Sequence, residues 1–185
     1  MFLSSEALPE AMAGYGDVIT LAIFAHTHMD EMRVLKPTDA AGAGAPAEGV
    51  ALKMVPSISP INGNNPTFML AQIDGSTGEL KDYQVFVASN TTGIDTQWSE
   101  EYDFAKAYKE PGFTAAAAAD LIAGFKADPM AQTAASKSYI QDYGSGTGAR
   151  ALGTFWQPYT CALRNDGAEA FRECVCGEPM RQVKP

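Results

Sequence analysis

The sequence contains only two histidines, and they stand two residues apart as His26-Thr27-His28. They directly follow residues 17–25, DVITLAIFA, whose β-branched and apolar side chains predict a buried strand. Because side chains alternate along a strand, residues i and i+2 point the same way, and both imidazoles can converge on one metal ion or on two neighbouring ions. Neutral imidazole is a good ligand for zinc. A histidine pair placed for packing or hydrogen bonding stays open as the alternative.

A second candidate lies in a loop that is dense in proline, asparagine and glycine, PSISPINGNNP at residues 56–66. Asn62, Asn64 and Asn65 are candidates for contacting a substrate head group, because loops often carry binding residues. Asparagine and glycine also serve tight turns, so a purely structural role for the three side chains stays open.

The remaining sequence predicts the elements that must position these residues. A short helix is expected within residues 4–14, and a flexible loop at residues 37–49. Strands are expected at residues 31–36, 50–55, 67–73 and 80–87, the last two joined as a hairpin. Helices are expected at residues 98–107, 114–127, 130–143 and 155–176, with Thr114 as an N-cap. We therefore expect a β-rich unit followed by a small helical unit.

Composition and charge limit the class of protein. The 185 residues are 46% apolar and 19% charged, which is typical of one globular domain or of a domain with an appendage. A net charge of −9 argues against a general nucleic-acid binder, which needs a basic face. It does not exclude a phosphate-containing substrate, because bound divalent metals can invert the local field. No apolar run reaches the roughly 18 residues of a transmembrane helix.

Three cysteines, Cys161, Cys174 and Cys176, lie near the C-terminus. The sequence favours a disulfide between Cys161 and either Cys174 or Cys176, which indicates an oxidising compartment. A zinc site is disfavoured because it needs about four ligands and no histidine lies nearby. Three reduced thiols remain the alternative.

The segment around the histidines, LAIFAHTHMDEMRVL, resembles the last metal-binding motif of the calcineurin-like metallophosphoesterases, and more narrowly of their acid sphingomyelinase-like branch. Residues 55–66 look like that branch's Pro-Ser-x-Thr-Pro-x-x-x-x-Asn-Pro segment, followed by a strand that ends in Gln72-Ile73-Asp74. Residues 98–108 and the tail WQPYTCALRN…CVC resemble the helical C-terminal region of the branch. Ala25 replaces the family's usual glycine, and we expect alanine to be tolerated there if its φ is negative.

The resemblance implies an α+β fold in two parts. Residues 1–90 would be the C-terminal part of a metallophosphoesterase αββα sandwich, and residues 91–185 a small helical sphingomyelinase-type C-terminal region. Cys161 and Cys174 are spaced like a disulfide-bonded pair of that branch. The family relationship implies a secreted or periplasmic protein, although no export signal is recognisable in this sequence.

The resemblance also implies a chemistry. His26 and His28 would each ligate one of two divalent metal ions, zinc in many members, and two such ions activate water for displacement at phosphorus. The substrate would be a phosphodiester or phosphoanhydride, with phospholipids included. Asp30 and Glu31 are candidates for orienting the rings, although solvation at the surface is the expectation for both.

The family's other metal ligands come from upstream motifs, and this sequence has neither a further histidine nor room for them. We therefore expect a fragment of a phosphodiesterase that is inactive alone and requires a missing N-terminal half. Without that half, the apolar faces of the strand at 18–25 would be exposed and would favour self-association. A non-catalytic binding or accessory module is the alternative, and a one-ion site using His26, His28 and a nearby acid is a third possibility.

Overall fold

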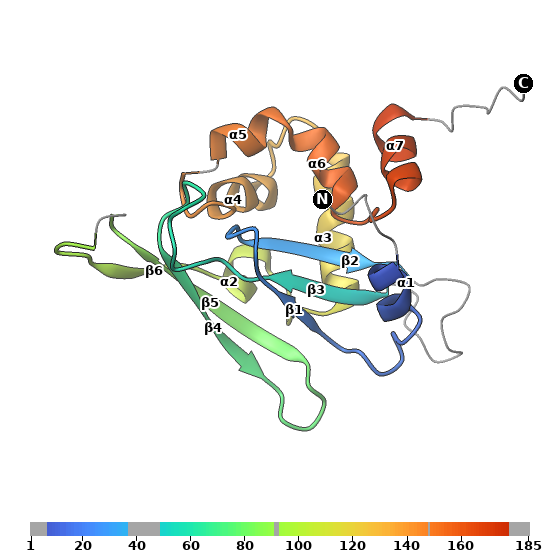
Figure 1. The fold of residues 1–185 in the computed structure, drawn as a ribbon, viewed down its shortest axis with the longest axis horizontal. Helices are drawn as coiled ribbons and strands as arrows, with labels where there is room; N and C mark the ends of the chain where they lie inside the picture. The colour runs from blue at the N-terminus through green and yellow to red at the C-terminus, as the bar shows by residue number, and fades with distance from the viewer. Residues whose placement is uncertain (1–6, 37–48, 91–92, 148, 178–185) are drawn as a thin grey trace, which may run out of the picture.

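The structure, a computed structural model, describes residues 7–36, 49–90, 93–147 and 149–177. Two three-stranded sheets and several helices form a mixed α+β fold (Figure 1). The expected α+β class is confirmed, whereas the αββα sandwich stays a prediction. The flexible loop expected at residues 37–49 lies outside the described residues, except for its last glycine.

The first sheet, sheet A, carries the histidines just beyond the end of an edge strand. It contains β1 (Ala22–Phe24), β2 (Glu31–Leu35) and β3 (Val50–Met54) in the order β1-β3-β2. β3 pairs in parallel with β1 and antiparallel with β2, and every residue of β2 and β3 is buried. The prediction of a buried strand at 17–25 is wrong in burial and in length, because β1 is an edge strand in which only Ala22 is buried. It is short because the amides of Val18 and Ile19 donate to the Tyr15 carbonyl in a turn instead of joining a ladder.

The second sheet, sheet B, is an antiparallel meander of β4 (Thr67–Ile73), β5 (Leu80–Ala88) and β6 (Trp98–Asp103). The expected hairpin between β4 and β5 is confirmed. At its turn the Asp74 carboxylate accepts hydrogen bonds from the Ser76 and Thr77 amides. The hydrogen bond from the Ser76 hydroxyl, followed by those from the two amides, lowers the pKa of Asp74 to about 2.

The prediction of a helix at residues 98–107 is wrong for the first six residues, because these form β6. Trp98 and Tyr102 are four residues apart, and this spacing places side chains on one side of a strand as well as of a helix. In the sheet, Trp98 packs against Phe68 of β4 with ring centroids 5.1 Å apart. The helix begins only at α2 (Phe104–Tyr108), where the Asp103 carboxylate caps the amide of Lys106.

The other helices largely follow the sequence-based expectation. Thr114 caps α3 (Ala115–Ala127) by accepting from the Ala117 amide at 3.1 Å, as predicted. The helix expected at 155–176 is interrupted by residues 163–167. No helix in the described part of the chain is long and apolar enough to cross a membrane. The remaining helices are α1 (Ala7–Ala13), α3 (Ala115–Ala127), α4 (Ala134–Asp142), α5 (Ala149–Thr154), α6 (Trp156–Ala162) and α7 (Ala168–Cys176).

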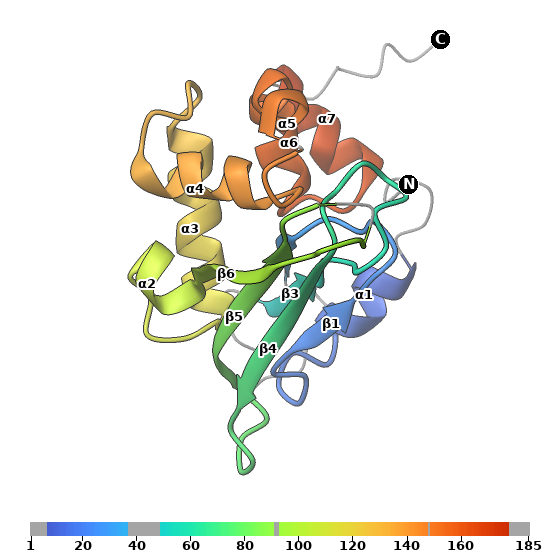
Figure 2. The ribbon, with the colours of Figure 1, turned by 90° about the vertical axis from the view of Figure 1, so that its left-hand side faces the viewer.

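The larger of two hydrophobic clusters joins both sheets to the helices, and the smaller one packs α1 against sheet A. Tyr83 of β5 stacks on Phe104 of α2, and Phe125 of α3 packs against Trp156 of α6. α3 lies against β2 and β3. Figure 2 shows α2, α3 and α4 together on the left of the view. The division expected at residue 90 stays a prediction, although β6, beyond that point, pairs with β5 before it.

A disulfide between Cys161 and Cys174 ties α7 to α6, with the two Cα atoms 5.7 Å apart. The sequence left Cys174 and Cys176 open as partners, and the structure selects Cys174, the pairing that the family resemblance implied. Cys176 is free and exposed. α7 has no buried residue, so the covalent bond is a main attachment of this helix to the rest of the protein.

We predict that a Cys161→Ser/Cys174→Ser variant loses about 2–3 kcal/mol of unfolding free energy, because the open chain regains loop entropy in the unfolded state. Urea unfolding followed by circular dichroism measures this change. Cys176→Ser, which leaves the disulfide intact, is the matched control and should unfold at the wild-type midpoint. Equal midpoints for all three proteins would contradict a stabilising disulfide.

Candidate functional site

The two histidines lie in a short turn, the His turn (residues 25–30), which begins where β1 ends. His26 has φ 96° and His28 has φ 68°, in the left-handed region that residues other than glycine rarely adopt. This backbone conformation costs about 1–3 kcal/mol of free energy per residue. It is concentrated at functional sites, where surrounding contacts stabilise it. The histidines do not continue the strand, so strand alternation does not apply to them and convergence of the rings stays a prediction. The φ angle of Ala25 is not positive, so the condition for alanine in place of the glycine expected from the family resemblance is met.

The imidazole of His28 is held by one hydrogen bond. Its Nδ1 lies 3.0 Å from the Ser59 carbonyl oxygen. A carbonyl oxygen only accepts, so in the neutral ring Nδ1 carries the proton and Nε2 carries the lone pair. A ring whose other nitrogen is bound in this way is the usual form of a metal-ligating histidine. His28 is half-buried and His26 is exposed.

The loop at residues 56–66, the Asn loop, supports the His turn and contains the three asparagines singled out from the sequence. Asn62 is exposed and donates to the Thr27 carbonyl at 3.1 Å. Asn64 is only 1% exposed and donates to backbone carbonyls within the loop. Asn65 is half-buried and donates to the Ser145 carbonyl at 2.8 Å. Contact of these side chains with a substrate stays a prediction.

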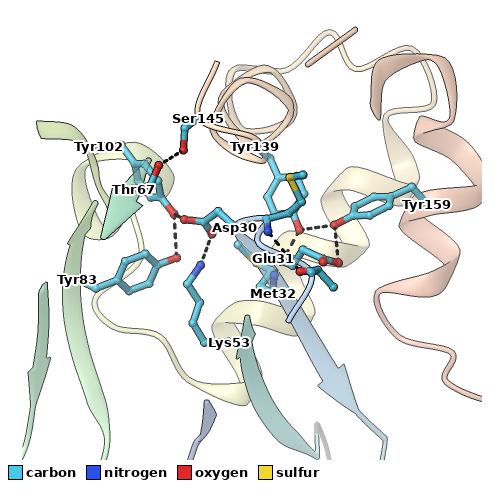
Figure 3. Close-up of polar contacts among 12 residues, drawn as sticks. Asp30, Glu31, Met32, Lys53, Thr67, Tyr83, Tyr102, Tyr139, Ser145 and Tyr159 are labelled. Carbon is cyan, nitrogen blue, oxygen red and sulfur yellow. Dashed lines mark hydrogen bonds and ion pairs between the residues drawn. The ribbon is translucent and has the colours of Figure 1, made fainter. Parts of the chain in front are cut away.

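Asp30 was expected to be solvated, and this expectation is wrong because Asp30 is 5% exposed. Its carboxylate forms an ion pair with Lys53 of β3, which is fully buried, and accepts a hydrogen bond of 2.8 Å from the Tyr102 hydroxyl of β6 (Figure 3). The Lys53 ammonium also lies 4.8 Å from the centre of the Tyr83 ring. Burial raises the pKa of the Tyr83 and Tyr102 phenols well above the ordinary value, so both remain hydroxyl groups.

Glu31 is also buried, contrary to expectation, at 2% exposure. Its carboxylate pairs with Arg33 at 3.2 Å and accepts a hydrogen bond from the Tyr159 hydroxyl at 3.3 Å. The hydroxyls of Tyr159 and Tyr139 are 2.9 Å apart, and the Tyr139 oxygen accepts from the Met32 amide. Figure 3 shows the partners of Asp30 and those of Glu31 on opposite sides of the start of β2.

The turn after α4, the Ser145 turn (residues 143–147), connects these groups to the Asn loop. The Tyr143 carbonyl accepts from the Asp30 amide at 2.9 Å. The Ser145 hydroxyl lies 2.5 Å from that of Thr67, and the Thr147 hydroxyl donates to the Gly63 carbonyl at 2.5 Å. The Ser145 turn therefore contacts both the His turn and the loop that supports it.

Two further carboxyl groups interact electrostatically with Asp30. Burial, then the charge of Asp30, raises the pKa of Asp142 to about 7. Burial, then the charges of Asp142 and Asp30, raises the pKa of Glu101 to about 8, and one Glu101 oxygen, Oε2, is buried with no hydrogen-bond partner in the described structure. Near neutral pH these two carboxyl groups therefore hold a substantial share of their protons.

These pKa values predict how stability depends on pH. The folded-state values lie above the ordinary 3.8 of Asp142 and 4.5 of Glu101, so the unfolded chain binds fewer protons and stability falls as pH rises from about 4 to 8. We expect each carboxyl to account for about 2 kcal/mol of this loss. Urea unfolding at intervals between pH 5 and pH 8 measures it. Asp142→Asn and Glu101→Gln should each flatten the profile, and a wild-type profile that rises with pH would contradict the assignment.

The side chains in the described part of the chain are not sufficient for a two-ion centre. Among the described residues, no group of three or more His, Cys, Asp or Glu side chains is placed to hold a metal ion. The proposed one-ion site therefore finds no third donor of these types within the described ranges. His26 and His28 can each offer one nitrogen, so any complete centre needs donors from outside this part of the chain.

Comparison with known proteins gives one informative likeness. No family model matches the chain. The chain is 28% identical over 116 residues to sphingomyelin phosphodiesterase B of Dictyostelium discoideum. The match covers 60% of this chain but only 18% of that relative. The chain is thus similar to a limited part of a much longer phosphodiesterase.

Proposed function

We propose that this chain is part of a metal-dependent phosphodiesterase and contributes His26 and His28 as metal ligands. The observation that carries the proposal is the His28 ring, whose Nδ1 is bound to the Ser59 carbonyl while Nε2 keeps its lone pair. The left-handed backbone at both histidines adds to it, because such strain is kept where surroundings and function require it. The likeness to a sphingomyelin phosphodiesterase supports a phosphodiester or phosphoanhydride substrate, including phospholipids.

The remaining metal ligands would come from an upstream part of an αββα sandwich. β1 is an edge strand, and its outer side has no partner strand in the described structure. Val18, before β1, is 69% exposed, and Ile23, within β1, is 48% exposed. A further strand added at this edge would complete the sheet beside the His turn and bury these apolar side chains. In the chain alone, the same surface favours self-association.

The complete centre would hold two divalent ions, zinc in our proposal, which activate a water and stabilise displacement at phosphorus. The two imidazoles of this chain do not complete such a centre, so we assign it no step of the reaction beyond holding metal. The disulfide between Cys161 and Cys174 supports a secreted or periplasmic location, because disulfides persist in oxidising compartments.

We predict that zinc binds the Cys176→Ser chain through both histidines, the substitution removing the one free thiol that would compete for the ion. His26→Ala and His28→Ala each remove a metal ligand. We therefore expect each to weaken zinc binding by more than the roughly 10–100-fold that follows the loss of a residue that only orients a ligand. Isothermal titration calorimetry measures the affinity. Asn165→Ala, far from the His turn in sequence, is the control and should bind as the parent does.

Activity tests the claim that the chain is incomplete. With zinc present, the isolated chain should hydrolyse bis-p-nitrophenyl phosphate no faster than the His26→Ala/His28→Ala variant. Zinc-dependent turnover that disappears in this variant would contradict incompleteness. Zinc affinity that is unchanged by both substitutions would instead favour the alternative, a non-catalytic accessory module.

A further inference from the structure

We propose that Asn64 is the positioning residue of His28, acting through the Ser59 carbonyl that both side chains share. The inference rests on the proposed ligand role of His28 and names the group that prepares its ring. Asn64 lies in the Asn loop, and its amino group binds backbone carbonyls of that loop, so its effect on the histidine is indirect.

The geometry of the shared carbonyl carries the proposal. The Asn64 Nδ2 atom lies 3.1 Å from the Ser59 carbonyl oxygen, and the His28 Nδ1 atom lies 3.0 Å from the same oxygen. A carbonyl oxygen has two lone pairs, so it can accept from both groups at once. The amide thus holds the acceptor in the place where the imidazole donates to it.

The orientation of the Asn64 amide is fixed by its surroundings. Nδ2 also lies 3.1 Å from the carbonyl oxygens of Ser57 and Asn65, so three acceptors face the amino group. A flipped amide would direct its own oxygen at these three carbonyls, which repel it. The amide oxygen is instead buried with no partner in the described structure. Leaving a buried acceptor unpaired costs free energy, and the hydrogen bonds of the amino group, whose two hydrogens are shared among the three carbonyls, offset this cost.

The loop is also fastened to the backbone of the same histidine. The Ser57 amide donates to the His28 carbonyl at 3.3 Å, and the Ser57 hydroxyl accepts from the Ser59 amide at 3.1 Å. Asn64 binds the carbonyls of both serines, so it joins the contact to the His28 backbone with the contact to the ring. One buried side chain therefore controls the two attachments.

The neighbouring asparagines do not share this position. Asn62 donates to the Thr27 carbonyl from the exposed side of the loop, and Asn65 donates to the Ser145 carbonyl. Neither side chain has a recorded hydrogen bond to the Ser59 carbonyl in the described structure. Asn65 is therefore a matched control within the same loop: its loss loosens the loop but leaves the shared acceptor held.

The tautomer of His28 in the metal-free chain tests the proposal. Long-range ¹H–¹⁵N spectra, recorded at a pH where the imidazole is neutral, distinguish a proton on Nδ1 from one on Nε2. In the wild type we expect His28 mainly in the Nδ1–H form, and in Asn64→Ala a mixture enriched in Nε2–H, because the ring loses its fixed acceptor. Asn65→Ala should keep the wild-type form.

Several results would overturn the inference. A wild-type His28 mainly in the Nε2–H form would do so before any substitution is made, which covers the case in which Asn64→Ala fails to fold. The inference would also be overturned if folded Asn64→Ala kept the wild-type tautomer of His28. The same holds if Asn65→Ala changed this tautomer as much as Asn64→Ala does. Backbone amide spectra and circular dichroism establish that each variant is folded.

Zinc affinity separates this inference from the proposed function. If both hold, Asn64→Ala weakens zinc binding by about 10–100-fold, as expected for an outer partner of a ligand. A shifted tautomer with no zinc binding even in the wild type supports the positioning role and overturns the ligand role. An unchanged tautomer with strong binding through both histidines overturns the positioning role alone.

Discussion

The buried ion pair between Lys53 and Asp30 is the interaction on which the rest of the site depends. An ammonium in the interior costs several kcal/mol unless a charge compensates it, so neither partner can leave without a large penalty. Asp30 follows His28 by two residues, and it also accepts from Tyr102 of sheet B and donates its amide to the Tyr143 carbonyl. Sheet A and sheet B therefore meet at the Asp30 carboxylate, and the Ser145 turn binds the backbone amide of the same residue.

With that end fixed, the strained backbone of the His turn becomes understandable. Two left-handed histidines would relax in a free peptide, and here they are held between β1 on one side and Asp30 on the other. The Asn loop supplies the third support, through contacts to the Thr27 and His28 carbonyls and to the His28 ring. The outcome is an imidazole fixed in one tautomer at the end of a sheet edge, which suits a metal ligand better than a core residue.

Much of the fold follows from local sequence pattern. The strands at 31–36, 50–55, 67–73 and 80–87, the cap at Thr114 and the participation of Cys161 in a disulfide were all predictable, because neighbouring residues determine them. The strand at 98–103 was missed because aromatic side chains four residues apart fit both periodicities. Local ambiguity of this kind is resolved only by pairing with β5.

The burial of Asp30 and Glu31 could not be predicted from their neighbours. Apart from Arg33, which is two residues from Glu31, their partners are distant in sequence: Lys53 lies 23 residues from Asp30, Tyr102 lies 72 residues from it, and Tyr159 lies 128 residues from Glu31. One usable signal was present, namely a lone lysine in the otherwise apolar strand VALKM, since such a lysine needs a buried acid. The histidine pair was found from spacing and resemblance, but its turn geometry was not.

The most direct test of the central claim is to identify the atoms that bind zinc. Zinc is titrated into the ¹⁵N-labelled Cys176→Ser chain while the ring nitrogens of both histidines are followed. The account predicts that the Nε2 resonance of His28 and one ring nitrogen of His26 both shift as zinc is added, while the Nδ1 proton of His28 is retained. A chain in which neither ring responds, or in which zinc is taken up only at carboxylates, would contradict it.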